Sequence, residues 1–133
     1  MLAGIGPFVR RVARHAAWAP LTVLVLHDLG ARLFGHEPYV DSVMHFLGGM
    51  AAAFFFRYAS AVADKTLGAP SDTALDVIAF GLTCAVALFW EFGEFAADLY
   101  FGHNIQRGLA NTMRDLALGV SGAVVYLGAR RLS

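Results

Sequence analysis

The sequence has few charged residues and a single cysteine. Charged residues make up 15% of its 133 residues, whereas soluble domains carry about 25%. The formal net charge is zero, so charge gives no reason to expect a nucleic-acid partner. One cysteine, Cys84, excludes an internal disulfide and a paired-cysteine metal motif. The chain also lacks a hydrolase nucleophile motif, a glycine-rich phosphate loop and a cofactor fingerprint, so neither haem nor a nucleotide is expected.

Hydrophobic residues make up 58% of the chain and gather in four long segments. Each segment is long enough to cross a bilayer, which takes about 20 residues. The first is expected to be a retained helix rather than a cleaved signal, because His27, Asp28 and Arg32 follow its apolar run at once. We predict an all-α polytopic membrane protein: one transmembrane domain over 1–133, built as a four-helix transmembrane bundle with a short N-terminal amphipathic lead. The predicted helices are about 17–34, 40–63, 74–100 and 109–129.

The basic residues predict how the bundle is oriented. With four spans, both termini lie on one side of the membrane, together with the loop between the second and third spans. The positive-inside rule assigns the side richer in lysine and arginine to the cytoplasm. The N and C termini are therefore expected in the cytoplasm. The terminal side would carry Arg10, Arg11, Arg14, Arg57, Lys65, Arg130 and Arg131, and the opposite side Arg32, Arg107 and Arg114.

Polar residues interrupt the apolar segments in three clusters. An ionisable group inside a bilayer costs at least about 2.5 kcal/mol, so by default it marks a functional site. Spacings of three or four residues place each cluster along one helix face. The predicted topology carries all three clusters to the extracytoplasmic half of the bundle. They are Asp41 with His45, Glu91 with Glu94 and Asp98, and Asn111 with Asp115.

Carboxylates and a histidine on facing helices are the usual components of metal sites in helix bundles. So many carboxylates need protonation, salt bridges to Arg107 or Arg114, or a bound cation. One imidazole among oxygen ligands would suit Mg²⁺, Mn²⁺, Ca²⁺ or Zn²⁺. The candidate metal ligands are Asp41, His45, Glu91, Glu94, Asp98 and Asp115, and the candidate catalytic residues are His45, Glu91 and Asp115.

Simpler structural roles compete with this interpretation. Asp115 could form a structural ion pair with Arg114 or Arg107, and His27 with Asp28 is expected to help close the bundle. Small residues after the polar clusters are expected to serve close helix packing alone. Solvation at a helix end would account for Asp41, Glu94 or Asp98.

Three functions fit the predicted site. The leading one is a cation-assisted reaction or binding event on a membrane-embedded substrate, which makes the chain a candidate metal-dependent enzyme. Proton or ion transport is the second, since intramembrane carboxylates can relay protons. The third is a non-catalytic subunit of a larger membrane complex. Membrane lipids are expected partners in every case, and a bundle this small favours a homo-oligomer or a larger complex for the last two.

The clusters resemble the VanZ-like and YjdF-like families of small bacterial membrane proteins. The resemblance covers about 41–123 and implies a bacterial cytoplasmic (inner) membrane location with action at the outer face, on lipid or cell-wall chemistry. It is carried by Asp41 and His45 before a glycine-rich helix, Glu91 with Glu94, and Asn111 ahead of Asp115, Gly122 and Ala123. The chain departs from the VanZ-like pattern at Ser42 (usually Lys), Glu94 (Gln), Asn111 (often Asp) and Gly119 (Asn). The missing lysine and the extra glutamate make this site more acidic.

Overall fold

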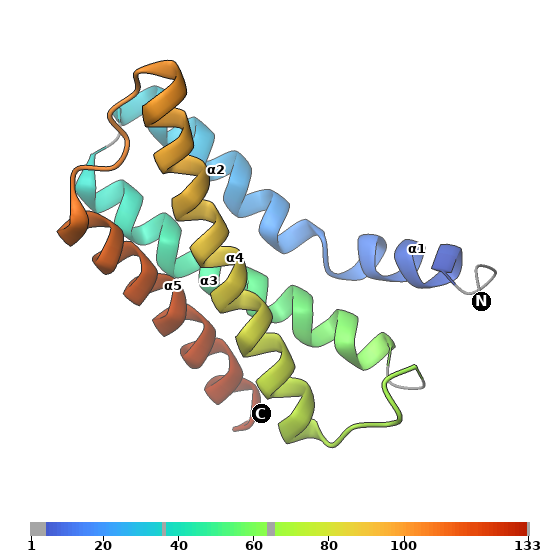
Figure 1. Ribbon diagram of the computed structural model, residues 1–133. Helices are drawn as coiled ribbons and strands as arrows, with labels where there is room; N and C mark the ends of the chain where they lie inside the picture. Colours follow the sequence, from blue (N-terminus) through green and yellow to red (C-terminus); the bar gives the residue numbers. More distant parts are fainter. Residues whose placement is uncertain (1–4, 36, 64–65, 133) are drawn as a thin grey trace.

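A computed structural model describes residues 5–35, 37–63 and 66–132. The described chain is built from five helices, so the all-α class predicted from the sequence is confirmed (Figure 1). Helices α2 to α5 begin and end within two residues of the bounds predicted for the four spans. The amphipathic lead is a separate helix, α1. Lys65, used above to predict orientation, lies outside the described residues. The helices are α1 (Ile5–His15), α2 (Trp18–Phe34), α3 (Pro38–Val62), α4 (Asp72–Phe101) and α5 (Leu109–Arg130).

The ends of the longest helices follow from local sequence. Pro38 opens α3 at a position where its missing N–H costs nothing. Ser71 caps α4, because its hydroxyl accepts a hydrogen bond of 3.2 Å from the Ala74 amide. Gly102 ends α4 in the left-handed region with φ of 67°, where a side chain would be strained. These signals fix where α3 begins and where α4 begins and ends, and so which polar residues lie near the bundle ends.

Two helices, α3 and α4, are long and apolar enough to cross a membrane. They have 25 and 30 residues. Helix α2 has only 17 residues, and α5 carries Arg114 and Asp115 in its second turn. Length and composition therefore establish two candidate spans, where the sequence predicted four.

Helix α3 is the centre of the packing and contacts α1, α2, α4 and α5. It approaches α5 most closely through glycines: a Cβ placed on Gly49 would lie 1.9 Å from the Gly119 carbonyl oxygen, and one on Gly122 would lie 2.1 Å from that of Phe46. Only glycine allows backbones to meet at this distance. This contact brings the first half of α3, with His45, against the first half of α5, with Asp115.

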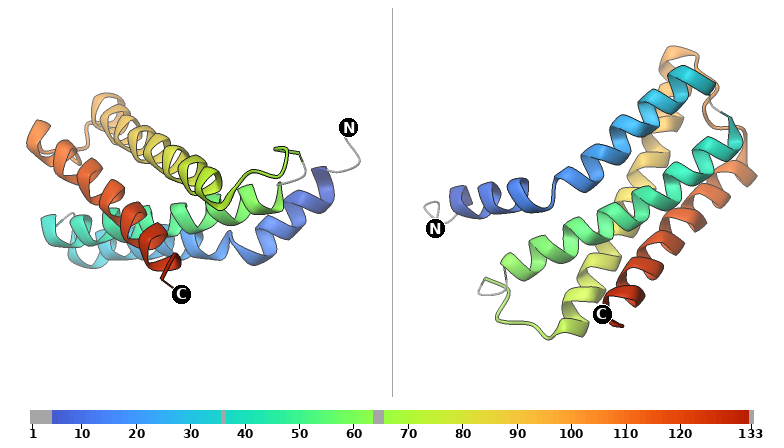
Figure 2. Two further views of the ribbon diagram at one scale, coloured as in Figure 1. Left: turned by 90° about the horizontal axis from the view of Figure 1, so that it is seen from below. Right: turned by 180° about the vertical axis from the view of Figure 1, so that it is seen from behind.

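Helix α1 leaves the bundle at an angle to α2, as all three views show (Figures 1 and 2). It is tied to the bundle by Val12 and by Ala16, which follows the helix; both side chains are buried. Two of its other apolar residues, Ile5 and Val9, are exposed beside Arg10, and Phe8 is half-buried. The helix is therefore amphipathic, with an apolar face that the rest of the chain leaves uncovered.

The connections bring four helix ends together at one end of the bundle. The end of α2, the start of α3, the end of α4 and the start of α5 all lie near the loop 102–108 (Figure 1). The polar clusters predicted from the sequence lie on these same helix ends. The candidate site is therefore built where four helices meet.

Candidate functional site

His45 lies between carboxylates from different helices. Its Nε2 atom is 3.4 Å from Asp41 Oδ1, one helical turn earlier on α3. Its Nδ1 atom is 3.9 Å from Glu91 Oε1 on α4. The structure thus brings the first two polar clusters together. We call the group His27, Asp41, His45, Glu91, Glu94 and Asp115 the histidine–carboxylate cluster.

Asp115 joins the cluster from α5, with its side chain fully buried. Arg114 reaches back over it, with Nε 3.1 Å from Asp115 Oδ1 and an amino nitrogen 3.7 Å from Asp41 Oδ2. Asn111 also donates a hydrogen bond to Asp115. The ion pair with Arg114, one of the two partners expected for Asp115, is present. Asp41 and Asp115 therefore share a cationic side chain.

Glu91 and Glu94 form the other half of the cluster and have no such partner. Their exposed fractions are 2% and 7%. The Gln106 side-chain amide donates to Glu91 Oε2 at 3.2 Å, and the Trp90 indole donates to Glu94 Oε1 at 2.7 Å. Both donors are neutral. Within the described residues, no lysine or arginine lies at ion-pair distance from either glutamate.

Two buried polar atoms in the cluster have no hydrogen-bond partner. They are His45 Nε2 and Glu91 Oε1. Leaving a buried polar atom unpaired costs about 1–3 kcal/mol, so folded proteins rarely do so without a reason. These atoms belong to the two residues that face each other across α3 and α4. A ligand between the two helices would give Glu91 Oε1 a partner, and one on the other side of the imidazole, where Asp41 Oδ1 lies 3.4 Å away, would reach His45 Nε2.

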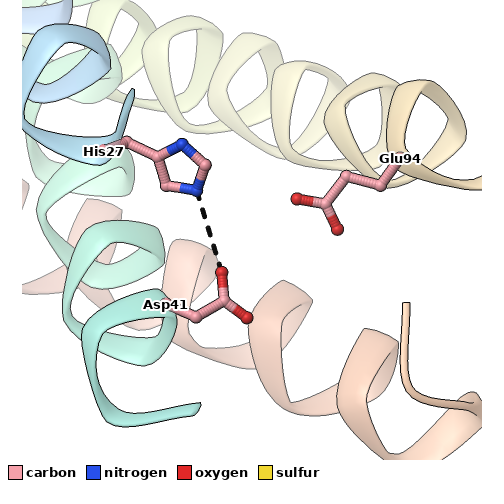
Figure 3. Close-up of side chains that lie close together, drawn as sticks. All are labelled: His27, Asp41 and Glu94. Atoms are coloured by element: carbon pink, nitrogen blue, oxygen red, sulfur yellow. Dashed lines mark ion pairs between the residues drawn. The ribbon is translucent and has the colours of Figure 1, made fainter. Parts of the chain in front are cut away.

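Ligand atoms of the cluster fall into three overlapping groups that could hold a metal ion. In each group the atoms lie within 4.8 Å of one another. Figure 3 shows the first: His27 points at Asp41, with Nε2 3.9 Å from Oδ1, and Glu94 reaches toward them from α4. His45 belongs to both of the others. The groups are His27 with Asp41 and Glu94, Asp41 with His45 and Asp115, and His45 with Glu91 and Glu94.

Asp98, a candidate ligand from the sequence, lies outside these groups. Its two carboxylate oxygens accept hydrogen bonds of 2.8 Å each from the backbone amides of Ile105 and Gln106. It thereby holds the loop 102–108 against the end of α4. The same hydrogen bonds place the Gln106 side chain on Glu91.

Sequence reasoning assigned three residues of this region to other roles or to none. From the sequence, His27 is expected only to close the bundle, and Trp90 belongs to none of the polar clusters. Gln106 lies in a loop, where no periodicity indicates a role. The signal that could have found them is depth, because each lies in a part of its helix or loop that the topology carries to the same end of the bundle. Asp28 instead faces outward and pairs with Arg32 at 2.8 Å.

A second charged cluster lies at the opposite end of the bundle. Asp76 is its hub: Oδ1 is 2.8 Å from Arg57 Nε and 3.0 Å from Arg130, and Oδ2 is 2.8 Å from Arg131 Nε. Arg57 also pairs with Asp72. We call these five residues the arginine–aspartate cluster. It ties α3, α4 and the end of α5 together, and the sequence reasoning used its arginines only to predict orientation.

Comparison with known proteins places the chain in one family. No curated protein and no solved structure matches it. A family model described as "Predicted membrane protein (DUF2238)" matches residues 10–132, which includes all of α2 to α5. Membrane residence of the family agrees with the two candidate spans and explains why large apolar side chains such as Phe89 and Phe92 are exposed. The chain belongs to the DUF2238 family of predicted membrane proteins.

Proposed function

We propose that this protein binds a divalent cation at His45, Glu91 and Glu94 and uses it in a reaction or binding event on a lipid-like or cell-envelope substrate. One observation carries the proposal: two buried glutamates and a largely buried histidine lie together, Glu91 Oε1 has no hydrogen-bond partner, and no described lysine or arginine pairs with either glutamate. Holding such carboxylates ionised in an apolar bundle requires a positive charge. A divalent cation supplies it.

The ligand types narrow the choice of cation. Oxygen ligands with a single imidazole suit Mg²⁺, Mn²⁺, Ca²⁺ or Zn²⁺. Asp41 and Asp115 flank His45 on its other side and would contribute ligands or charge there. Such a cation polarises a phosphate or carbonyl oxygen or lowers the pKa of a bound water. In an enzyme of this kind, His45, Glu91 or Asp115 would accept the proton.

The arrangement in the membrane is part of the proposal. All four helices α2 to α5 cross the bacterial cytoplasmic membrane as a bundle, both termini lie in the cytoplasm, and α1 lies on the cytoplasmic face. The arginines of α1 and of the arginine–aspartate cluster support this orientation, because they lie at the end opposite to the candidate site. The resemblance to VanZ-like and YjdF-like proteins, with their expected action at the outer face, agrees with it.

Cysteine labelling tests the orientation. Glu37→Cys and His103→Cys, made in a Cys84→Ala background, should react with a membrane-impermeant maleimide in intact cells. Thr66→Cys, exposed at the other end of the bundle, is the matched control and should react only after lysis. Labelling of positions 37 and 103 only from the cytoplasmic side would reverse the topology and overturn action at the outer face.

Metal analysis of the purified protein tests the cation. Wild-type protein should retain a divalent cation after dialysis, and Glu91→Gln should bind it at least about tenfold more weakly with an unchanged far-UV spectrum. Asp28→Asn removes an exposed carboxylate at the same end of the bundle and should retain the cation. Wild-type protein that binds none of Mg²⁺, Mn²⁺, Ca²⁺ and Zn²⁺ would refute the proposal.

Proton or ion transport is a second candidate, because imidazoles and carboxylates alternate through the cluster. His27, Asp41, His45 and Glu91 follow one another at 3.9, 3.4 and 3.9 Å. Proton uptake by vesicles that contain the protein, abolished by Glu91→Gln in the absence of metal, would favour transport. Protein that neither binds metal nor moves protons would instead fit a non-catalytic subunit, in which the cluster fixes helix packing.

A further inference from the structure

An apolar cavity of about 150 Å³ lies beside the histidine–carboxylate cluster. Its floor is α3, where Gly48, Gly49 and Ala52 leave room that larger side chains would fill. An apolar cavity of this size holds a group of about six carbon atoms, such as benzene. Its lining is largely apolar, and Pro20, Val23, Leu24, Met44, Val86 and Ala87 form most of its walls.

The cavity lies between two helices whose backbones stay apart. Helices α2 and α4 both contact α3, but no pair of backbone segments from α2 and α4 comes close within the described residues. Wall residues on both helices, Leu24 and Val86, have exposed fractions of 47% and 44%. In a bilayer these positions face the acyl chains. The cavity is therefore accessible sideways, from the lipid.

One end of the cavity is formed by residues of the candidate site. His27 and Trp90 close it with an edge-to-face ring contact at 5.4 Å between α2 and α4. His45 also lines it, with its side chain nine-tenths buried and Nε2 unpaired. An apolar chain in the cavity would thus end at the unpaired imidazole and the carboxylates beyond it. The cavity and the cluster therefore meet at His27 and His45, which belong to both.

We propose that this site binds a phosphate-bearing anionic membrane lipid, with part of a hydrocarbon chain in the cavity and the headgroup at the histidine–carboxylate cluster. The headgroup part rests on the proposed cation, since a divalent cation held by carboxylates attracts phosphate oxygens. The chain part rests on the cavity alone. A hydrocarbon chain fits because the lining is apolar, the opening faces lipid, and the volume matches a few methylene groups rather than a helix.

Photo-crosslinking tests the chain part. The protein is placed in phosphatidylcholine vesicles doped with a phosphatidylglycerol that carries a diazirine on its acyl chain. Crosslinks should concentrate on Met44 and Val86 relative to Val77, which faces outward from α4 with 64% exposure. Equal crosslinking at all three positions would overturn the cavity as a chain site.

Cavity-filling variants with matched controls sharpen the test. Gly48→Leu should lower crosslinking of Met44 to the level of Val77, because a Cβ there meets only Val23 at 3.9 Å and the remaining atoms enter the cavity. Gly81→Leu adds the same side chain where nothing lies within 4 Å and should change nothing. Val23→Phe, with outward Val25→Phe as its control, repeats the test if Gly48→Leu fails to fold. Unchanged labelling of Met44 in a folded cavity-filling variant would overturn the proposal.

The same samples separate the two halves of the proposal. A diazirine phosphatidylcholine in place of the phosphatidylglycerol should label Met44 more weakly. Equal labelling by the two lipids would refute the preference for an anionic headgroup. If the protein binds no metal but crosslinks still concentrate at Met44 and Val86, the chain site is supported and the cation is refuted. If the protein binds metal but all three positions crosslink equally, the cation is supported and the chain site is refuted. Weakening of a dimer by Gly48→Leu, without a lipid effect, would mean that a second copy occupies the cavity and would overturn the lipid site.

Discussion

The two charged clusters at opposite ends of the bundle differ in how their charges are balanced. In the arginine–aspartate cluster, both oxygens of Asp76 pair with arginines, at 2.8 to 3.0 Å. In the histidine–carboxylate cluster, Glu91 and Glu94 meet only neutral donors and His45, and Glu91 Oε1 has no hydrogen-bond partner. Asp76 is thus balanced by charges of the protein. Glu91 and Glu94 are not balanced by any lysine or arginine of the described residues.

This difference separates a structural role from a binding role. Charges that are paired within the protein stabilise the packing of α3, α4 and α5, and removing one strands the others. Charges that are left unpaired destabilise the bundle until something binds them. Neutralising Asp76 should therefore lower stability, and neutralising Glu91 should leave stability unchanged or raise it.

The largest expected effect is at Asp76. Asp76→Asn removes the negative charge shared by three arginines, of which Arg57 is buried with 7% exposure. The variant should lose up to about 3–5 kcal/mol of unfolding free energy, because buried Arg57 keeps only its pair with the exposed Asp72. Thermal unfolding in detergent would show this as a lower melting temperature or poor recovery of folded protein.

Asp28→Asn is the control for this substitution. The Asp28–Arg32 pair is exposed on both sides, and such pairs contribute about 0–1 kcal/mol. A melting temperature for Asp76→Asn as high as that of Asp28→Asn would mean that the arginine–aspartate cluster does not hold the helices together.

A smaller loss of unfolding free energy is expected for a substitution where α3 meets α5, between the two clusters. Gly122→Ala would place a Cβ 2.1 Å from the Phe46 carbonyl oxygen, so the two backbones must move apart. Overpacking of this kind costs about 1–3 kcal/mol. Thermal unfolding should show the loss, and metal binding should weaken too, since α3 carries His45 and α5 carries Asp115.

Gly128→Ala, on the same helix with nothing within 4 Å, is the matched control and should keep both properties. A Gly122→Ala variant that unfolds earlier but binds metal as tightly as wild type would show that α5 is not part of the metal site.

The sequence predicted one cluster and missed the other for a physical reason. Helical spacing and alternating chain direction are enough to carry Asp41, His45 and Glu91 to one end of the bundle. The contacts around Asp76 instead join residues 19, 54 and 55 positions apart, and no local pattern encodes such contacts. Which helices touch also depends on side-chain volume: Gly49 and Gly122 bring α5 onto α3, whereas α2 and α4 stay apart and leave the cavity.

The candidate site was likewise predictable only where its contacts depend on local sequence. The sequence offered Arg114 and Arg107 as partners for Asp115, and the structure shows the pair with Arg114. The participation of His27 and Gln106 depends on the angle of α2 and on the path of the loop 102–108, neither of which periodicity defines. Length and apolar content predicted the helices well because they act locally, along one segment at a time.

Glu91→Gln should have the opposite sign to Asp76→Asn when no metal is present. It removes one of two neighbouring buried carboxylates, and so relieves repulsion of roughly 1 kcal/mol or less. Melting in the presence of a chelator should therefore be unchanged or slightly higher than for wild type. Added cation should then raise the melting temperature of wild type only. A chelator-treated Glu91→Gln that melts as low as Asp76→Asn would place both clusters in the structural class.

A similarly small effect on stability, with none on the cation, is expected at Asp98, which the sequence grouped with Glu91 and Glu94 and the structure joins to the loop 102–108. Asp98→Asn keeps one side-chain oxygen but loses an acceptor for the Ile105 or Gln106 amide. The expected loss is about 1 kcal/mol, with the cation retained. Gln106→Ala removes the side chain that this loop places on Glu91, and it should weaken cation binding less than Glu91→Gln does. Loss of the cation from Asp98→Asn but not from Gln106→Ala would make Asp98 a ligand, as its helical spacing first predicted, and would extend the metal site toward the outer end of α4.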